Sequence, residues 1–372
     1  MSENPQDPYA DIRPYNDDEV GPVVVRLLGN AEFIDALTRF RFPLSSRWVG
    51  FLLRPLVRGV LKRELSGVDS IDTMQQVIAS YMQRMIERTT GELSFSGLDR
   101  LEPDSAYLFI SNHRDIAMDP AFVNWGLFHH GLQTVRIAIG DNLLRKPYVS
   151  DLMRLNKSFI VKRSAKGVRE KLAALMELSS YINHSVHSGH SIWIAQREGR
   201  AKDGNDQTDP AILKMLHVSQ KKGATFAEAV KKLNIVPVAI SYEYDPCDAA
   251  KARELRALDA EGSYEKSQFE DIDSIARGIT GYKGDVHVAF GEPVQGEFDT
   301  AEALAAEIDR QIHANYKLHS SNLIAAGDTA GVSADKQQQY QQRISELDEG
   351  ARTWFERMYA YPVINQRTGM ES

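Results

Sequence analysis

A histidine and two aspartates lie close together in the segment SNHRDIAMDP, residues 111–120. An imidazole accepts a proton near neutral pH, and a neighbouring carboxylate orients the ring and stabilises its protonated form. Such a pair is suited to taking the proton of a hydroxyl group as that group attacks a carbonyl. His113 is therefore the candidate general base, with Asp119 as its partner and Asp115 as the rival partner.

The surrounding pattern places this cluster at the end of a strand. The stretch AYLFISN is typical of a buried strand, and a helix is expected to begin near Pro120. Ligands of α/β folds bind at the carboxyl ends of strands. A structural interpretation competes, because Asp119 before Pro120 is also a good helix N-cap. The segment alone leaves both interpretations open.

Strands and helices alternate after Gly91, which predicts an α/β sheet. Strands are expected in ELSFSGL, AYLFISN, TVRIAIG, SFIVKR, SIWIAQ, IVPVAISYEY and DVHVAFG. Helices are expected at about 119–128, 168–187 and 226–232. The sequence thus predicts a catalytic domain at 91–298.

Helical patterns flank this region on both sides. The first 20 or so residues are polar, hold three prolines and are expected to be extended. Apolar residues then recur at helical spacing from Pro22 to about Thr89, with interruptions near 41–46 and 66–70. Near the C-terminus, DTAEALAAEIDRQIHANYKLHSS predicts a helix and DKQQQYQQRISELDEGARTWFERMYAY predicts a helix pair with an aromatic face. We therefore predict helical regions at 1–90 and 299–372.

Composition limits the classes of binding partner and the cellular compartment that are expected. A net charge of −7 argues against a nucleic-acid partner, which requires a dominant basic face. The single cysteine, Cys247, cannot form an internal disulfide, and no leader opens the chain, so a cytoplasmic location is expected. No window approaches the roughly 20 apolar residues that span a bilayer. Any membrane contact is therefore expected to be peripheral, on the inner face of the cell membrane.

One segment has the pattern of a helix at a membrane surface. Residues 47–63 interleave Trp48, Leu52 and Leu56 with several arginines and lysines. The same pattern suits a helix that packs on the core with its arginines in water, and Pro55 distorts either version. Both interpretations stay open.

Two other kinds of site find no support. His184, His187 and His190 recur every third residue, but a metal site would need helical facing pairs plus a carboxylate or thiolate partner, and Gly189 ends the helix before His190. No metal site is predicted. The sequence contains no Walker loop, dinucleotide fingerprint or Gly-x-Ser-x-Gly motif, so nucleotide chemistry and serine hydrolysis are not expected.

Three more blocks follow the histidine segment in order. In NKSFIVKR, residues 156–163, Lys162 or Arg163 supplies a cation at a strand end. In AQREGR, residues 195–200, Gly199 allows close backbone approach. Arg197, Arg200 and Lys202 form a positive cluster there that suits a phosphate, although a charged surface turn has the same composition. The last block is the strand IVPVAI at 235–240.

These four blocks together resemble the family of glycerol-3-phosphate and 1-acylglycerol-3-phosphate (lysophosphatidate) acyltransferases, over about 91–298, as a divergent bacterial-type member. The family separates its histidine and aspartate by four residues, whereas five separate His113 from Asp119 here. Pro120 and the apolar run after it match Asp119 to the family aspartate, with one residue inserted in the loop. Asn156 replaces a family glycine, and Gln196-Arg197 replace Phe-Pro.

The resemblance implies a mixed sheet flanked by helices and transfer of a fatty acyl group to a hydroxyl of glycerol 3-phosphate or lysophosphatidate. The donor would be acyl-CoA or an acyl carrier protein thioester, used as a co-substrate, with no bound cofactor. His113 would be the base, and Arg200 with Glu198 and Gly199 would hold the acceptor's phosphate. Lys162 or Arg163 would add a second phosphate contact. The alternatives are a non-catalytic peripheral lipid-binding protein and an acyl-thioester hydrolase.

Overall fold

The computed structural model describes residues 7–42, 46–265, 267 and 270–371. Two compact units emerge from the contacts between residues. The first combines the described residues of Met1–Gln83 with Arg136–Lys171, and the second combines Arg84–Val135 with Leu172–Ser372 as far as that range is described. The chain therefore contributes two separate segments to each unit.

Four helices begin the first unit: α1 (Asp17–Gly29), α2 (Ala31–Arg41), α3 (Ser46–Glu64) and α4 (Ile71–Thr89), the last of which ends in the second unit. Asn16 and Glu19 form a capping box that starts α1, and the Asn30 side chain accepts from the Phe33 amide at 2.9 Å to start α2. Apolar residues of α1, α2 and α4 meet in one buried cluster that also includes Val68 and Leu155; its members are Val20, Val23, Val24, Leu27, Phe33, Ile34, Val68, Met74 and Leu155.

The first unit also contains two parallel strands, β3 (Arg136–Gly140) and β4 (Ser158–Val161). The connection between them includes η2 (Asp141–Leu143) and α6 (Pro147–Leu155). Asp151 on α6 accepts from the Arg26 guanidinium at 2.8 Å and from the Tyr15 hydroxyl at 2.7 Å. These bonds fasten α6 to the segment around α1.

Five strands form the sheet of the second unit, in the spatial order β1 (Leu93–Ser96), β7 (Val286–Phe290), β6 (Ile235–Tyr242), β2 (Leu108–Ser111) and β5 (Ile192–Ala195). All neighbours pair in parallel except β6 and β7, which are antiparallel. The sheet is therefore mixed. Every residue of β2 and β6 is buried, as expected for central strands covered on both faces.

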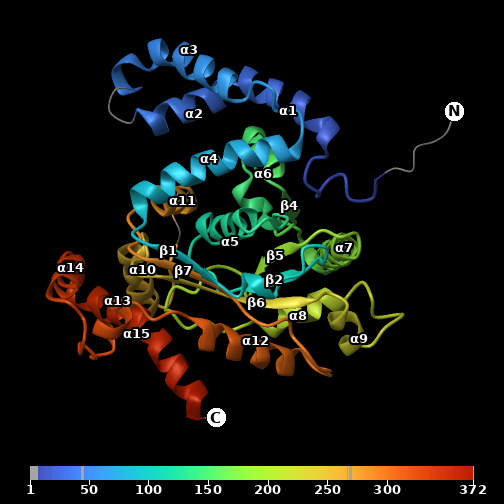
Figure 1. The fold of residues 1–372 in the computed structure, drawn as a ribbon. Helices are drawn as coiled ribbons and strands as arrows, with labels where there is room; N and C mark the ends of the chain where they lie inside the picture. Colours follow the sequence, from blue (N-terminus) through green and yellow to red (C-terminus); the bar gives the residue numbers. More distant parts are fainter. Residues whose placement is uncertain (1–6, 43–45, 266, 268–269, 372) are drawn as a thin grey trace. The chain divides into compact units, whose positions relative to one another are not determined.

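Helices cover both faces of this sheet, with α5 (Met118–His129) on one face and α12 (Ala301–Asn315) on the other (Figure 1). Successive side chains of a strand point to opposite faces. On β6, Tyr242 accordingly contacts Phe122 of α5, while Ser241 contacts His319 on the opposite face. The remaining helices between the strands are α7 (Gly167–His187), α8 (Pro210–His217), α9 (Phe226–Lys231), α10 (Asp248–Glu261) and α11 (Glu270–Thr280); η1 (Leu98–Arg100) follows β1.

The last three helices, α13 (Ser320–Ala325), α14 (Ala334–Ser345) and α15 (Glu349–Glu371), pack with α10. Aromatic side chains form their shared core, where the rings of Phe355 and Tyr359 lie 4.9 Å apart and Tyr340 meets both. The predicted aromatic face of the C-terminal helix pair is thus buried against the α/β region.

The predicted fold class is confirmed: an α/β fold has a mixed sheet flanked by helices, with helical N- and C-terminal regions. All seven predicted strands and the three predicted internal helices are present. The prediction missed α6, α8, α10 and α11, and it extended the N-terminal arm too far, because α1 begins at Asp17. The boundaries at 90 and 298 stay predictions. Within the described ranges, no helix has the length and apolar character to cross a membrane.

Candidate active site

Asn112 fixes the end of β2 to the neighbouring strand. Its side-chain amide accepts from the Ile240 amide at 2.7 Å and donates to the Ile240 carbonyl at 2.9 Å. The same Nδ2 also reaches Asp206 at 3.2 Å. Asn112 thus continues the backbone pairing between β2 and β6 by one residue, and the chain leaves the sheet at His113.

His113 lies on the loop between β2 and α5, with its side chain 12% exposed. Its Nδ1 lies 2.8 Å from Oδ2 of Asp119. The ring also contacts the indole of Trp193 edge to face, with 5.7 Å between centroids. Among the described residues, no hydrogen bond occupies Nε2, so that nitrogen is available to a ligand.

Asp119 is fully buried and accepts four hydrogen bonds. Its Oδ2 accepts from His113 and from the backbone amides of Arg114 at 2.6 Å and Asp115 at 3.0 Å. Its Oδ1 accepts from the Tyr242 hydroxyl at 2.6 Å. A carboxylate surrounded by donors requires that Nδ1 of His113 carry a proton, so Nε2 is the basic nitrogen of the neutral ring.

Asp115 does not contact the imidazole. Its Oδ1 accepts from the amides of Ala117 and Met118, both at 2.9 Å, and so caps the first turn of α5. The alternative interpretation of Asp119 as the N-cap is therefore wrong, because α5 begins at Met118 and contains Asp119. Burial, and next the charge of Asp119, raise the pKa of Asp115 to about 6.

Arg114 points into the protein, a feature that the sequence analysis missed. Its guanidinium donates to Asp206 at 2.6 Å and lies 5.8 Å from the centre of the Tyr316 ring. Lys251 of α10 donates to the Arg114 carbonyl at 2.7 Å and pairs with the buried Asp245. Burial alone would raise the pKa of Asp245, but Lys251 outweighs it and holds that pKa below its ordinary value. Side chains on both sides therefore immobilise the loop that carries His113.

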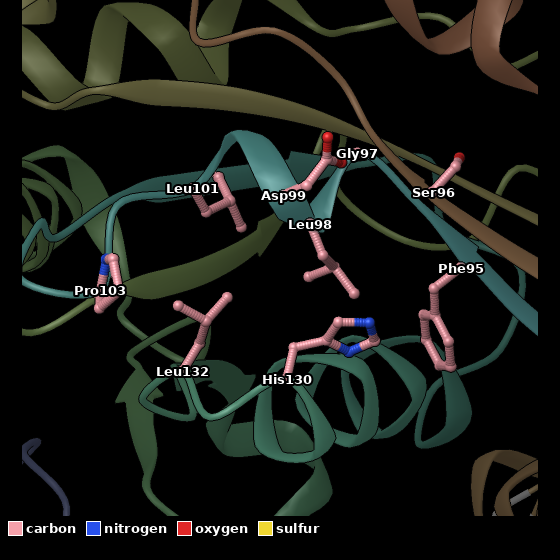
Figure 2. A pocket seen from close by; sticks show the side chains of 9 residues that line it. All are labelled: Phe95, Ser96, Gly97, Leu98, Asp99, Leu101, Pro103, His130 and Leu132. Atoms are coloured by element: carbon pink, nitrogen blue, oxygen red, sulfur yellow. The ribbon is translucent and has the colours of Figure 1, made fainter.

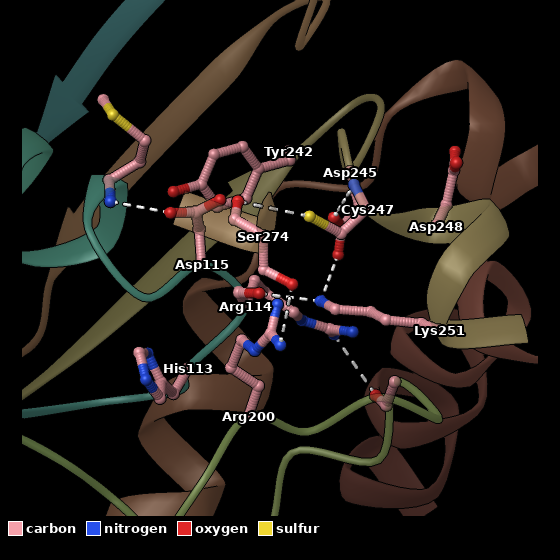
Figure 3. A network of polar contacts seen from close by, with 12 residues as sticks. His113, Arg114, Asp115, Arg200, Tyr242, Asp245, Cys247, Asp248, Lys251 and Ser274 are labelled. Atoms are coloured by element: carbon pink, nitrogen blue, oxygen red, sulfur yellow. Dashed lines mark hydrogen bonds and ion pairs between the residues drawn. The ribbon is translucent and has the colours of Figure 1, made fainter. Parts of the chain in front are cut away.

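The third block lies beside the histidine loop. The Ala201 amide donates to the His113 carbonyl at 2.9 Å, which joins the two loops next to Arg200. The Arg200 guanidinium is directed toward Ser274 of α11, at 3.4 Å (Figure 3). Lys202 is instead paired with Glu254. The Arg200 guanidinium therefore lies near the His113 loop as a cation that a ligand can bind. The Lys202 ammonium does not have this role, because it is paired with Glu254.

Two residues of the third block face solvent, whereas Gln196 is fully buried. Glu198 and Gly199 are exposed, and Arg197 is half-buried. Gly199 adopts φ of +75°, a left-handed conformation that favours glycine, and a side chain added there would meet only open space. The turn therefore leaves room for a ligand at Gly199.

Lys162 and Arg163 follow β4 in the first compact unit, whereas His113 and Arg200 belong to the second. The backbone amide of Arg163 donates to Asp141 at 3.1 Å, and its side chain lies against Gly140. A role of either cation in holding the acceptor stays a prediction.

A pocket of about 340 Å³ lies in the second unit, after β1 (Figure 2). Phe95, Leu98, His130 and Leu132 line it, and His130 is the C-cap of α5. Because His113 precedes the N-terminus of the same helix, the pocket lies at the other end of α5 from the histidine–aspartate pair.

Within the histidine triplet, His187 makes an ordinary helix contact. His187 bonds through Nδ1 to the Asn183 carbonyl at 2.6 Å within α7, which ends before Gly189. Across the described part of the chain, no group of three or more histidine, cysteine or acidic side chains is arranged to hold a metal ion.

Comparison with known proteins gives a family match for part of the chain. Residues 92–241 match the model of the Acyltransferase family. Among solved structures, the chain is similar to the 1-acyl-sn-glycerophosphate (LPA) acyltransferase PlsC from Thermotoga maritima, with 17% identity, 75% of this chain and 92% of that chain covered, and a TM-score of 0.42. The matched residues include His113, Asp119 and Arg200.

Proposed function

We propose that this enzyme moves a fatty acyl group from an acyl thioester, acyl-CoA or an acyl carrier protein thioester, to a hydroxyl of glycerol 3-phosphate or lysophosphatidate. The observation that carries the proposal is the His113–Asp119 pair, with Nδ1 and Oδ2 2.8 Å apart and Nε2 left available to a ligand. General base catalysis of alcohol attack requires a basic nitrogen held in one orientation. The family match supports the acyl transfer chemistry.

His113 acts on the attacking hydroxyl. Nε2 takes the hydroxyl proton while the oxygen attacks the thioester carbonyl, and Asp119 stabilises the resulting imidazolium through Nδ1. The tetrahedral intermediate collapses with loss of the thiolate, which then receives the proton from Nε2. A thiolate is a good leaving group, so positioning and base catalysis suffice without an acyl-enzyme intermediate.

The acceptor's phosphate is assigned to the loop after β5. Arg200 contributes a guanidinium, whose planar set of donors matches phosphate oxygens, and the Ala201 bond to the His113 carbonyl keeps it near the base. Glu198 and Gly199 form the exposed part of this site, with Arg197 beside them. A second phosphate contact from Lys162 or Arg163 stays a prediction from the sequence.

The test is transfer from labelled palmitoyl thioester to a panel of phosphorylated and neutral acceptors in detergent. We expect transfer to glycerol 3-phosphate or lysophosphatidate, and a loss of at least about a hundredfold in His113→Ala, since general base catalysis contributes that much. His129→Ala, at the far end of α5, is the matched control. Release of free fatty acid without ester formation would instead establish a thioesterase, and unchanged transfer by His113→Ala would refute the proposal.

Contact with an anionic membrane surface forms part of the proposal. On α3, Val57 is buried, while Leu52 and Leu56 are 62% and 57% exposed, and Arg58 and Lys62 are exposed nearby. An apolar row beside cations suits the boundary between lipid headgroups and acyl chains. The side chains of 47–49 and 51 lie outside the described residues. We expect binding to phosphatidylglycerol vesicles that Leu52→Asp with Leu56→Asp abolishes. Equal binding by this double variant would exclude α3 as the contact.

A further inference from the structure

The two oxygens of Asp119 have different donors. Oδ2 accepts hydrogen bonds from the His113 ring and from two backbone amides. Among the described residues, Oδ1 accepts from one donor, the Tyr242 hydroxyl at 2.6 Å. Asp119 is fully buried, so water does not replace a lost donor. Whether Oδ1 has a hydrogen-bond donor therefore depends on Tyr242.

Tyr242 is held so that its hydroxyl must point at Asp119. It is the last residue of β6, it is 4% exposed, and its ring lies 5.9 Å from that of Phe122 on α5. Burial, and next the neighbouring carboxylate of Asp119, raise its pKa well above the ordinary value. The hydroxyl thus keeps its proton and acts as a permanent donor.

We propose that Tyr242 is a positioning residue for the proposed reaction, which holds Asp119 in the rotamer that fixes the tautomer of His113. Without this donor, Oδ1 would be a buried polar atom with no partner, which favours rotation of the carboxyl group toward other donors. A rotated carboxyl group no longer requires the proton at Nδ1, so part of the His113 population would carry it at Nε2. That tautomer cannot act as the base.

A second tyrosine provides a matched control two residues further along. Tyr244 is also buried, at 1% exposure, but its hydroxyl has no hydrogen-bond partner within the described residues. The ring stacks under the Arg343 guanidinium at 4.9 Å, a contact that phenylalanine preserves. Tyr242→Phe and Tyr244→Phe therefore each remove one buried hydroxyl from the same stretch of chain, and only the first removes a donor to Asp119.

The kinetic arm measures kcat and both KM values for the full-length chain. This arm rests on the proposed function. We expect Tyr242→Phe to lower kcat about tenfold, the rate equivalent of one buried hydrogen bond, with KM for donor and acceptor unchanged. Tyr244→Phe should stay within about twofold of the parent. A Tyr242→Phe enzyme with parental kcat would overturn the inference.

The spectroscopic arm needs no turnover. Nitrogen-15 chemical shifts of the imidazole, assigned with His113→Ala, should show one neutral tautomer with Nδ1 protonated in the parent and in Tyr244→Phe. Tyr242→Phe should show exchange with the other tautomer, and Tyr242→Met provides a second variant without a donor should the first unfold. An unaltered tautomer in both variants overturns the inference. A changed tautomer in a protein whose parent does not transfer acyl groups supports the positioning role while refuting the proposed function.

Discussion

The side-chain amide of Asn112 pairs with both the amide and the carbonyl of Ile240, so one residue after β2 mimics the backbone of a strand. This pairing carries the chain to His113 in a fixed direction. Asn112 has no exposed surface, and its third bond goes to Asp206. The position of the proposed base therefore depends on a side chain that touches no substrate.

Replacement of Asn112 by alanine should destabilise the protein by about 3 kcal/mol. Three hydrogen bonds are lost, and the Ile240 amide and carbonyl are left unpaired in a buried site. The shift of the urea midpoint at constant m-value measures this loss. Asn112→Asp should destabilise the protein at least as much as Asn112→Ala, since its carboxylate faces the Ile240 carbonyl and Asp206. A midpoint equal to the parental one in Asn112→Ala would contradict the assigned role.

Asp119→Asn should keep the fold but lower kcat by roughly 10³-fold to 10⁴-fold. The amide is isosteric, and the Tyr242 hydroxyl can accept where it now donates. A neutral partner no longer stabilises imidazolium or selects the Nδ1-protonated tautomer. Steady-state kinetics with His113→Ala as reference measure the effect. If Asp119→Asn loses less activity than Asp115→Asn, then Asp115 rather than Asp119 serves the histidine.

Asp115→Asn should change how stability depends on pH. The folded-state pKa of about 6 lies above the ordinary 3.8, so the folded protein holds this proton more tightly than the unfolded chain. The resulting stabilisation is complete below about pH 3.8 and is lost as the pH rises through about 6. The shift corresponds to up to about 3 kcal/mol.

Asparagine keeps the oxygen that accepts from Ala117 and Met118 but does not titrate. The free energy of unfolding of Asp115→Asn, relative to the parent, should therefore rise between pH 4 and pH 7. Thermal unfolding at several pH values gives this difference. A constant difference over that interval would show that Asp115 does not titrate there.

Arg200→Gln should raise KM for a phosphorylated acceptor by about ten- to a hundredfold, as expected for loss of a charge-assisted contact. Its contact with Ser274 is long, at 3.4 Å, so the fold should tolerate the change. A neutral alcohol acceptor is the control, because its KM should not respond. Lys202→Gln should leave the phosphate preference intact, since that ammonium pairs with Glu254. Equal losses for both acceptors would remove Arg200 from the phosphate site.

Arg343→Met should destabilise the whole second unit by about 2–4 kcal/mol. Arg343 on α14 bonds to the buried Asp248 at 2.7 Å, and Tyr359 of α15 donates to the same oxygen at 2.8 Å. Removal of the cation leaves a buried carboxylate without its charge partner. Chemical unfolding followed by tryptophan fluorescence measures the change. Asp248→Asn combined with Arg343→Met should recover part of it, and failure to do so would show that packing, not charge, explains the loss.

Local pattern was sufficient to predict the seven strands and the place of His113 after β2. Alternation of apolar residues is a property of contiguous residues, and a buried strand leaves few alternatives. The helix α10 escaped prediction because its apolar face is weakly periodic: the charged residues Lys251 and Glu254 are buried along with Ala252. Burial of charges depends on partners such as Asp245 and Lys202 that lie elsewhere in the chain.

The sequence by itself determined the α/β class, the helical flanks, and a histidine with two candidate carboxylates in one short segment. Only the tertiary structure shows which of those carboxylates contacts His113: the loop turns the Arg114 and Asp115 amides toward Asp119, and β6 brings Tyr242 to its other oxygen. The contact between Tyr242 and Asp119 joins residues 123 positions apart. Chain folding, rather than spacing along the sequence, sets such a contact, because β2 and β6 become neighbours only when the sheet forms.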